Sequence, residues 1–198
     1  MKIAVIHDDA RALLSVRGPL LARLAELGHQ VHALVPPADE DVVAGIEALG
    51  VEYASYPLTR GRFSPLADLG TLLHLKQVLF RIRPGLVLSI SHKPAIFGSL
   101  AARMTWVDDR KRIHALVTGL GYPFTKMSGW KRRVVHAYTK YFMGGGLGAC
   151  HGIAFRTEED REVFRAFGVL PDNVPVTVVG EPLPEEGVDP LLSFMELV

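Results

Sequence analysis

Short runs of β-branched and aliphatic residues alternate with segments of helical periodicity along the whole chain, and this alternation constrains the fold most. The apolar runs predict strands at Lys2–Ile6, Val31–Val35, Val51–Tyr56, Leu86–Ile90, Ile113–Val117, Gly152–Phe155 and Val176–Val179. Helical spacing predicts helices at Leu13–Leu27, Asp39–Leu49, Pro65–Ile82, Ala95–Met104, Gly129–Phe142 and Glu158–Phe167. The three glycines from Gly144 predict the exit from the fifth helix. The alternation predicts an α/β fold with a doubly wound, mostly parallel, Rossmann-like sheet.

Composition narrows the class of protein. A chain of 198 residues suits one domain, and its 48% hydrophobic content suits a sheet covered on both faces. Cys150 is the only cysteine, which excludes an intrachain disulfide and favours a reducing compartment. The first strand begins at once, without a signal-peptide pattern, and no apolar run approaches the ~20 residues of a membrane span. We therefore expect a cytoplasmic location.

Charge is unevenly distributed although the formal net charge is only +1. Residues 101–140 contain nine basic and two acidic residues, whereas residues 157–198 contain ten acidic and two basic ones. The basic segment suits phosphates or an anionic membrane surface. Solvated helix faces are the alternative interpretation.

Common phosphate-binding and hydrolase motifs are absent. The turn after the first predicted strand, His7-Asp8-Asp9, lacks Gly-x-Gly-x-x-Gly, and neither Gly-x-x-x-x-Gly-Lys-Ser/Thr nor Gly-x-Ser-x-Gly occurs. Asp8 or Asp9 is instead predicted to cap the following helix. The eight histidines form no His-x-x-x-His pair, so we expect no metal site and no cofactor.

Two loops that follow neighbouring predicted strands carry the candidate chemistry. Ser91-His92-Lys93-Pro94 offers an imidazole for acid, base or hydrogen-bond roles and a lysine that suits phosphate. Thr118-Gly119-Leu120-Gly121 offers glycines that permit close approach of a ligand to the backbone. Because the carboxyl ends of parallel strands meet at one edge, we expect His92, Lys93, Thr118 and Gly121 to line one cleft.

Eight segments occur in a characteristic order and spacing. They are Lys-Ile-Ala-Val-Ile-His from Lys2, Arg-Gly-Pro-Leu from Arg17, Leu-Gly-His-Gln-Val-His-Ala-Leu-Val-Pro from Leu27, Pro-Leu-Thr-Arg-Gly-Arg-Phe-Ser-Pro from Pro57, Ser-His-Lys-Pro-Ala-Ile-Phe-Gly from Ser91, Leu-Val-Thr-Gly-Leu-Gly-Tyr from Leu116, Ile-Ala-Phe-Arg-Thr-Glu-Glu-Asp from Ile153 and Gly-Val-Asp from Gly187. Together they resemble the N-terminal domain of family 4 glycosyltransferases of the GT-B fold. The closest likeness is to bacterial enzymes that act on undecaprenyl-diphosphate-linked acceptors.

The resemblance implies a glycosyltransferase of hexosyltransferase type that works in surface polysaccharide or glycan assembly. Transfer would proceed with retained anomeric configuration, from a nucleotide-sugar donor to a lipid-diphosphate-linked glycan acceptor, and no nucleic acid is expected as a partner. The N-terminal domain of such an enzyme positions the acceptor. His92 and Thr118 become candidate catalytic residues, although some members place a histidine or an acidic residue in the loop after the fifth strand, the region in which Thr118 lies. Candidate acceptor-binding residues are Ser15, Arg17, Arg60, Arg62, Lys93, Gly119 and Gly121.

The resemblance also sets an expectation about domains. Residues 1–198 are expected to form a single acceptor-binding domain, with residues 180–198 approaching the crossing to a C-terminal donor domain that these residues lack. We expect the chain alone not to turn over a sugar nucleotide. Two other functions stay open: a stand-alone sugar- or nucleotide-binding module without turnover, and the N-terminal half of a sugar-nucleotide 2-epimerase.

Aromatic and basic residues are interleaved within residues 126–141. Trp130, Tyr138 and Tyr141 stand among Lys131, Arg132, Arg133 and Lys140. This mixture is typical of helices that lie on anionic membranes, and the helix at Pro65–Ile82 could contribute. Peripheral attachment to the inner face of the cytoplasmic membrane is therefore expected.

Overall fold

A parallel sheet of seven strands organises the computed structural model, which describes residues 1–59, 64–105, 111–118, 130–180 and 188–197. The strands are β1 (Lys2–His7), β2 (Gln30–Val35), β3 (Glu52–Ser55), β4 (Leu86–Ile90), β5 (Arg112–Val117), β6 (Gly152–Phe155) and β7 (Val176–Val178). Their order is β3-β2-β1-β4-β5-β6-β7, and every neighbouring pair is parallel. The predicted doubly wound α/β fold is confirmed.

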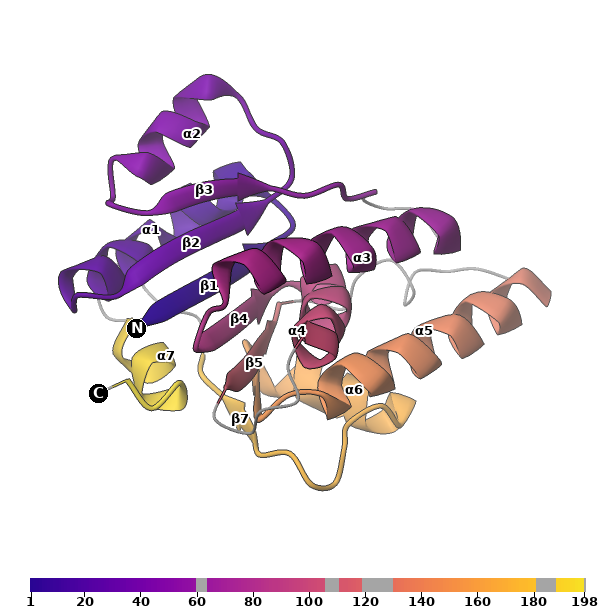
Figure 1. Cartoon of the computed structure of the whole chain (residues 1–198). Coiled ribbons are helices and arrows are strands. Elements are labelled where there is room, and N and C mark those ends of the chain that lie inside the picture. Colours follow the sequence, from indigo (N-terminus) through magenta and orange to yellow (C-terminus); the bar gives the residue numbers. More distant parts are fainter. Residues whose placement is uncertain (60–63, 106–110, 119–129, 181–187, 198) are drawn as a thin grey trace.

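Helices cover both faces of this sheet (Figure 1). One layer contains α1 (Ala10–Glu26), α2 (Glu40–Glu47) and α7 (Val188–Phe194); the other contains α3 (Pro65–Ile82), the π-helix η1 (Pro94–Gly98), α4 (Ser99–Thr105), α5 (Trp130–Gly148) and α6 (Glu158–Phe167). Alternate strand residues divide between the two layers, as the pleat requires. Ile3 and Val5 pack with the α1 layer, whereas Ala4 and Ile6 pack with the α3 layer.

The start of α1 is set by a side-chain cap. The Asp9 carboxylate accepts a hydrogen bond from the Ala12 amide at 2.9 Å, so the helix begins at Ala10, three residues before the predicted start. Asp9 is therefore the predicted cap, and Asp8 is left for another role.

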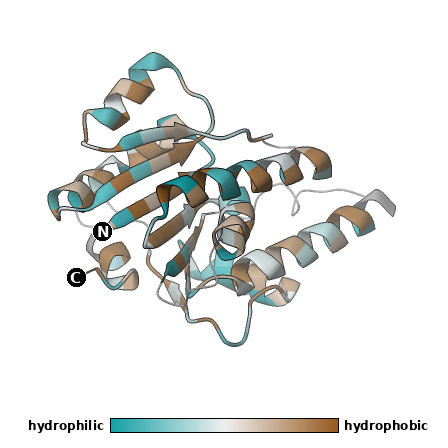
Figure 2. Cartoon of the chain, viewed as in Figure 1, coloured by the Kyte–Doolittle hydropathy of each residue, from teal (hydrophilic) through white to brown (hydrophobic). Residues whose placement is uncertain are grey.

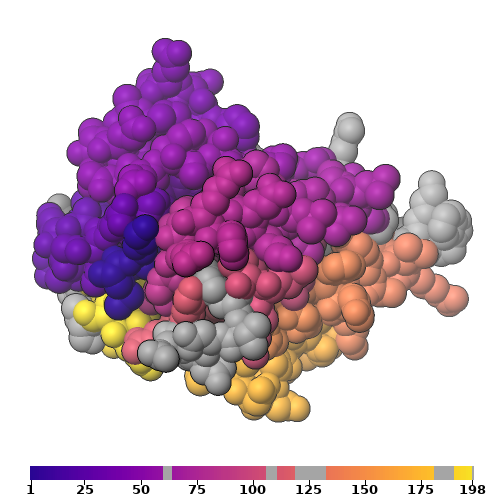
Figure 3. Space-filling model, in the orientation of Figure 1, coloured from indigo at the N-terminus to yellow at the C-terminus, as the bar shows by residue number. Residues whose placement is uncertain are grey.

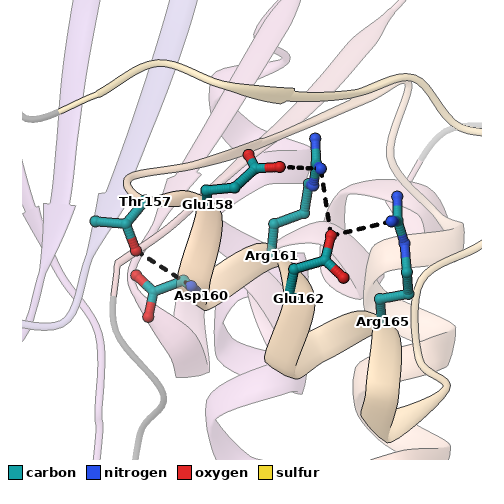
Figure 4. Close-up of polar contacts among 6 residues, drawn as sticks. All are labelled: Thr157, Glu158, Asp160, Arg161, Glu162 and Arg165. Atoms are coloured by element: carbon teal, nitrogen blue, oxygen red, sulfur yellow. Dashed lines mark hydrogen bonds and ion pairs between the residues drawn. The ribbon is translucent and has the colours of Figure 1, made fainter.

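Helix α6 combines a cap with favourable charges (Figure 4). The Thr157 hydroxyl accepts a hydrogen bond from the Asp160 amide at 3.1 Å, and the first turn is acidic, which suits the helix dipole. Arg165 pairs with Glu162 at 3.0 Å one turn later. The predicted bounds of this helix, Glu158–Phe167, agree with the structure.

The glycine triplet does not end α5, which corrects the sequence prediction. The helix continues through Gly144, Gly145 and Gly146 to Gly148. A Cβ atom at Gly146 would lie 2.7 Å from the Ile96 Cα atom and 2.8 Å from the Ile96 carbonyl oxygen. Glycine is needed here because α5 packs directly against the backbone of η1.

Helix α7 was not predicted. It returns the chain to the α1 layer, where Leu191, Leu192 and Met195 are buried.

None of the helices within the described ranges is long and apolar enough to cross a membrane.

Candidate functional site

The strand order reverses between β1 and β4, and the loops after these two strands meet there. β1 leads outward through β2 to β3, and β4 leads through β5 and β6 to β7. His7 is paired in register with Ile90, so Asp8 and Ser91 are the next residues along each strand direction. A crevice at such a reversal is the usual ligand site of open α/β sheets.

Ser91 makes the sharp turn out of β4. Its φ angle is +82°, a left-handed conformation that a residue with a side chain rarely adopts. The Ser91 amide donates to the Leu116 carbonyl at 3.0 Å, and its hydroxyl donates to Asp8 Oδ1 at 2.7 Å. Strained backbone of this kind concentrates at functional sites, where surrounding contacts hold it in place.

Asp8 is an ionised carboxylate at neutral pH. Burial alone would raise its pKa, but the hydrogen bonds with His7 and Ser91 and the nearby His7 charge lower that pKa below its usual value. His7 Nδ1 lies 3.2 Å from Asp8 Oδ1. The Tyr56 hydroxyl donates to the His7 carbonyl at 2.8 Å, which anchors the end of β1 within the core.

His92 follows directly and carries a neutral imidazole. Burial lowers the pKa of His92 to about 4, and the neighbouring Lys93 charge adds to the effect against the opposing pull of Asp8. Its ring packs edge-on against Phe164 of α6, with ring centroids 6.5 Å apart. At neutral pH His92 can therefore donate and accept hydrogen bonds without contributing positive charge.

Lys93 belongs to a buried polar network. Its Nζ atom donates to the Thr59 carbonyl at 2.6 Å and to Asp68 Oδ1 at 2.7 Å. Asp68 Oδ2 accepts a hydrogen bond from the Tyr138 hydroxyl at 3.1 Å. This network joins η1, α3 and α5, and it already engages the ammonium group that the sequence assigned to phosphate.

Thr118 lies beside the same loops. It is half-buried directly after β5, which pairs in parallel with β4, so His92 and Thr118 share one edge of the sheet. The predicted partners Gly119, Gly121, Arg60 and Arg62 fall outside the described residues.

The two predicted residues of α1 lie on different sides of that helix. Ser15 is exposed, whereas Arg17 is only 6% exposed. Burial and the charge of Arg156 lower the pKa of Arg17. Arg156 directly follows β6, so its backbone lies at the carboxyl edge of the sheet.

Three residues at the carboxyl edge of the sheet were not named from the sequence as candidate site residues: Asp8, Ser91 and Arg156. Two signals in the sequence could have found Asp8 and Arg156. The Asp8-Asp9 doublet contains one acid more than a helix cap needs, and Arg156 stands at the first position beyond a predicted strand.

A surface hollow of about 210 Å³ lies on the other side of β1, between the start of α1 and the β2–α2 loop. Arg11 and Asp39 both line it and form an ion pair at 3.1 Å. Within the described part of the chain, His, Cys, Asp and Glu side chains form no group of three suited to a metal ion.

Solved structures with this fold include several sugar-active proteins. A glycosyltransferase from Rickettsia africae matches with a TM-score of 0.60 and 11% identity, covering 100% of this chain and 50% of that one. A sucrose-phosphate synthase structure from Thermosynechococcus elongatus matches with a TM-score of 0.59 and 12% identity, covering 100% and 99%. A UDP-N-acetylglucosamine 2-epimerase matches with a TM-score of 0.56 and 12% identity, covering 91% and 46%. These identities establish the fold alone.

The chain spans about half the length of several of the structures it matches, between 42% and 50%. No curated protein matches its sequence. The model of the glycosyl transferase 4-like domain matches residues 16–180, which is most of the chain. The chain therefore belongs to the glycosyl transferase 4-like domain family.

Proposed function

We propose that this chain is the acceptor-binding half of a retaining glycosyltransferase of hexosyltransferase type. Its acceptor is a lipid-diphosphate-linked glycan in surface polysaccharide or glycan assembly, and its donor is a nucleotide-sugar. Family membership supports sugar transfer. The observation that carries the proposal is the placement of Asp8 and His92 at the strand-order reversal. An ionised carboxylate beside a neutral imidazole suits the hydroxyl groups of a sugar.

The proposed roles follow from the bonds that change. The acceptor hydroxyl oxygen bonds to the anomeric carbon, the bond from that carbon to the diphosphate oxygen breaks, and the hydroxyl proton passes to the leaving diphosphate. His92 and Thr118 orient the attacking hydroxyl, and Asp8 accepts hydrogen bonds from neighbouring sugar hydroxyls. The developing charge on the diphosphate needs cations and amides. We assign that task to a second domain.

The structure bears differently on the other residues that the sequence analysis named as acceptor-binding candidates. Lys93 already contacts Asp68 and Thr59, so in this proposal it shapes the loop that presents His92. Ser15 faces away from the sheet and is exposed to solvent. Arg60, Arg62, Gly119 and Gly121 stay candidates from the sequence alone.

An exposed apolar stripe supports attachment to an anionic membrane, the setting of a lipid-linked acceptor. Leu66, Leu69, Leu73 and Phe80 follow helical spacing on α3 and are 46–85% exposed. Figure 2 shows hydrophobic residues along α3. α5 lies next to α3 in the space-filling view (Figure 3). On α5, Tyr141 is 77% exposed. The one carboxylate of α3, Asp68, is buried. Apolar side chains without exposed acidic neighbours suit an anionic surface. We propose the inner face of the cytoplasmic membrane.

Acceptor binding tests the first proposal. The chain is titrated with short-chain prenyl-diphosphate-linked monosaccharides, and Asp8→Asn is expected to weaken the binding by about tenfold, as for loss of hydrogen bonds to a charged group. Asp39→Asn is the matched control, because Asp39 forms an exposed ion pair with Arg11 and lies outside the proposed site. Absence of binding by the whole panel would refute the acceptor role.

Incubation with UDP- and GDP-sugars separates the other candidates. We expect no turnover by these 198 residues alone. Conversion of a sugar nucleotide without an acceptor would favour an epimerase, whereas sugar-nucleotide binding without any acceptor binding would favour a stand-alone binding module.

Sedimentation with vesicles tests attachment. Leu66→Ser with Leu69→Ser is expected to reduce binding to vesicles that contain anionic lipid, because it removes apolar contact area. Val16→Ser, an exposed position on α1 in the other helix layer, serves as control. Equal sedimentation of all three proteins would contradict membrane attachment through α3.

A further inference from the structure

A buried carboxylate joins α3, α5 and the residue that precedes η1. Asp68, in the first turn of α3, is only 3% exposed. Lys93 Nζ donates to Asp68 Oδ1 at 2.7 Å, and the Tyr138 hydroxyl of α5 donates to Asp68 Oδ2 at 3.1 Å. Both oxygens of this carboxylate are therefore engaged, one of them by the residue that directly follows His92.

This ion pair contributes a fixed geometry more than it contributes stability. Removing two charges from water costs about as much as their attraction returns, and apolar residues of similar volume often stabilise a core as well. A buried ammonium, however, must stay where its acceptors meet. Lys93 Nζ has two such acceptors, because the Thr59 carbonyl also accepts from it, at 2.6 Å. The contacts with Asp68 and Thr59 therefore fix the direction of the Lys93 side chain.

His92 lies in the same backbone turn as Lys93. The Ala95 amide donates to the Ser91 carbonyl at 3.0 Å, which closes a single helical turn around both residues. Successive side chains of such a turn point about 100° apart, so the direction of Lys93 constrains that of His92. Lys93 extends to α3, whereas the His92 ring packs edge-on against Phe164 of α6.

The two ends of η1 are held in different ways. Its C-terminal end lies close against the sheet, where a Cβ atom at Gly98 would be 2.6 Å from Ser89 Oγ. Its N-terminal end follows the turn that carries His92, and side-chain contacts hold that turn: the hydrogen bond of Ser91 with Asp8 and the buried ion pair of Lys93. The place of the His92 ring therefore depends on the partners of its two sequence neighbours.

We propose that Asp68 is a positioning residue, which is held by Tyr138 and fixes, through Lys93, the place at which His92 presents its imidazole. Asp68 acts through Lys93 because both of its carboxylate oxygens are engaged within the protein. Its effect on acceptor binding rests on the proposed function, which assigns His92 to the acceptor hydroxyl.

NMR of the ligand-free 198-residue chain measures the place of His92 directly. In Asp68→Asn we expect weaker NOE contacts between the His92 and Phe164 rings, and a pKa of His92 that rises from about 4 toward 6.5 as the ring reaches water. Loss of the charge alone would act in the opposite direction, because the Lys93 charge already lowers the pKa of His92 and would lose its counter-ion. A rise in that pKa therefore reports movement of the ring.

Further variants decide the question if Asp68→Asn does not fold. Tyr138→Phe removes the hydroxyl that donates to Asp68 but keeps the ring that packs on Phe142, with centroids 4.5 Å apart, so we expect smaller changes in the same direction. Asp68→Glu keeps the charge and is expected to restore much of what asparagine loses. Tyr53→Phe, at a partly buried tyrosine of the α1 layer, and Asp39→Asn, at an exposed ion pair, are the controls. An unchanged His92 in every folded variant of Asp68 and Tyr138 would overturn the proposal.

Titration with the short-chain prenyl-diphosphate-linked monosaccharides keeps this inference apart from the proposed function. If both hold, Asp68→Asn weakens acceptor binding by about fivefold, as for the loss of one hydrogen bond, and has no further effect in a Lys93→Met chain. A displaced His92 ring without acceptor binding by any of the proteins supports the positioning role and refutes the function. Acceptor binding by the parent chain, with His92 in place in all variants, supports the function and overturns the positioning role.

Discussion

At the scale of single residues, the candidate site depends on groups held in costly states. Ser91 keeps a left-handed backbone, Asp8 stays ionised although partly buried, and His92 is half-buried in its neutral form. Each state is stable only because neighbours in the fold enforce it. These costs make the site sensitive to small substitutions and to acid.

Two substitutions at Ser91 distinguish the effect of backbone strain from that of the hydrogen bond to Asp8. Ser91→Ala keeps the strain and removes the hydrogen bond to Asp8, so we expect a loss of about 1–2 kcal/mol in the free energy of unfolding. Ser91→Gly loses the same bond but adopts a φ of +82° without strain, so its loss is smaller. Chemical denaturation of both variants measures the difference. A less stable glycine variant would contradict this account.

His92 and His114 predict acid sensitivity. The pKa values of His92 and His114 are lowered to about 4, from an ordinary value of 6.5, chiefly by burial. The unfolded chain therefore binds more protons between these pH values. Stability is fully present above pH 6.5 and falls as the pH drops toward 4, by an amount on the order of 3 kcal/mol per histidine.

Denaturation at a series of pH values checks this prediction. His114→Phe is expected to flatten the dependence between pH 6.5 and 4, because a phenyl ring can still pack edge-on against Phe194 but cannot titrate. His136→Phe, at a residue that is not deeply buried, is the comparison substitution. A pH dependence that is equal in both variants would exclude His114 as its source.

At the scale of elements, close backbone contact determines where helices run. α5 continues through three glycines because tertiary packing against η1 outweighs their low helix propensity. η1 in turn begins just after His92 and Lys93, so the packing of α5 helps to position the candidate site.

Neighbouring glycines in α5 predict opposite effects of the same substitution. Gly146→Ala places a methyl group against the Ile96 backbone, and we expect it to destabilise the protein by about 1–3 kcal/mol. A Cβ atom at Gly144 meets nothing within 4 Å, so Gly144→Ala is expected to stabilise by about 0.5–1 kcal/mol. Thermal unfolding compares the two. The same sign for both would show that helix propensity, rather than the contact with Ile96, dominates.

At the scale of the whole molecule, the last described helix, α7, packs into the same helix layer as the first helix, α1. α7 packs in the same core as α1 and contributes the fully buried Leu192. The N-terminus and α7 lie on the same side of the molecule (Figure 1). The α7 contact therefore stabilises the helix layer that contains α1.

Leu192→Ala tests this closure. We expect a loss of about 2–5 kcal/mol in the free energy of unfolding, the usual range for a leucine removed from a packed core. Leu66→Ala, at a position 85% exposed, is expected to change stability by less than about 0.5 kcal/mol. Denaturant unfolding measures both. A small effect at Leu192 would mean that α7 is only loosely docked.

Local patterns were sufficient for the class of fold. Strand runs, helical periodicity and their alternation depend on side chains within a few residues of one another, so all seven strands and the parallel, doubly wound sheet could be predicted. The candidate loops at Ser91–Lys93 and Thr118 followed from the same patterns, because strand ends mark the edge where ligands bind. The Asp9 cap was visible for the same local reason.

Contacts between distant segments decided the rest. The course of α5 past its glycines depends on Ile96, about fifty residues away, and the docking of α7 depends on the core that α1 shares. Lys93, read from the sequence as a phosphate ligand, contacts Asp68, whereas Asp8, read as a cap, contacts Ser91. The charge and availability of a group depend on burial and on partners far away in the sequence. The chemical character of the site therefore emerges only from the folded chain.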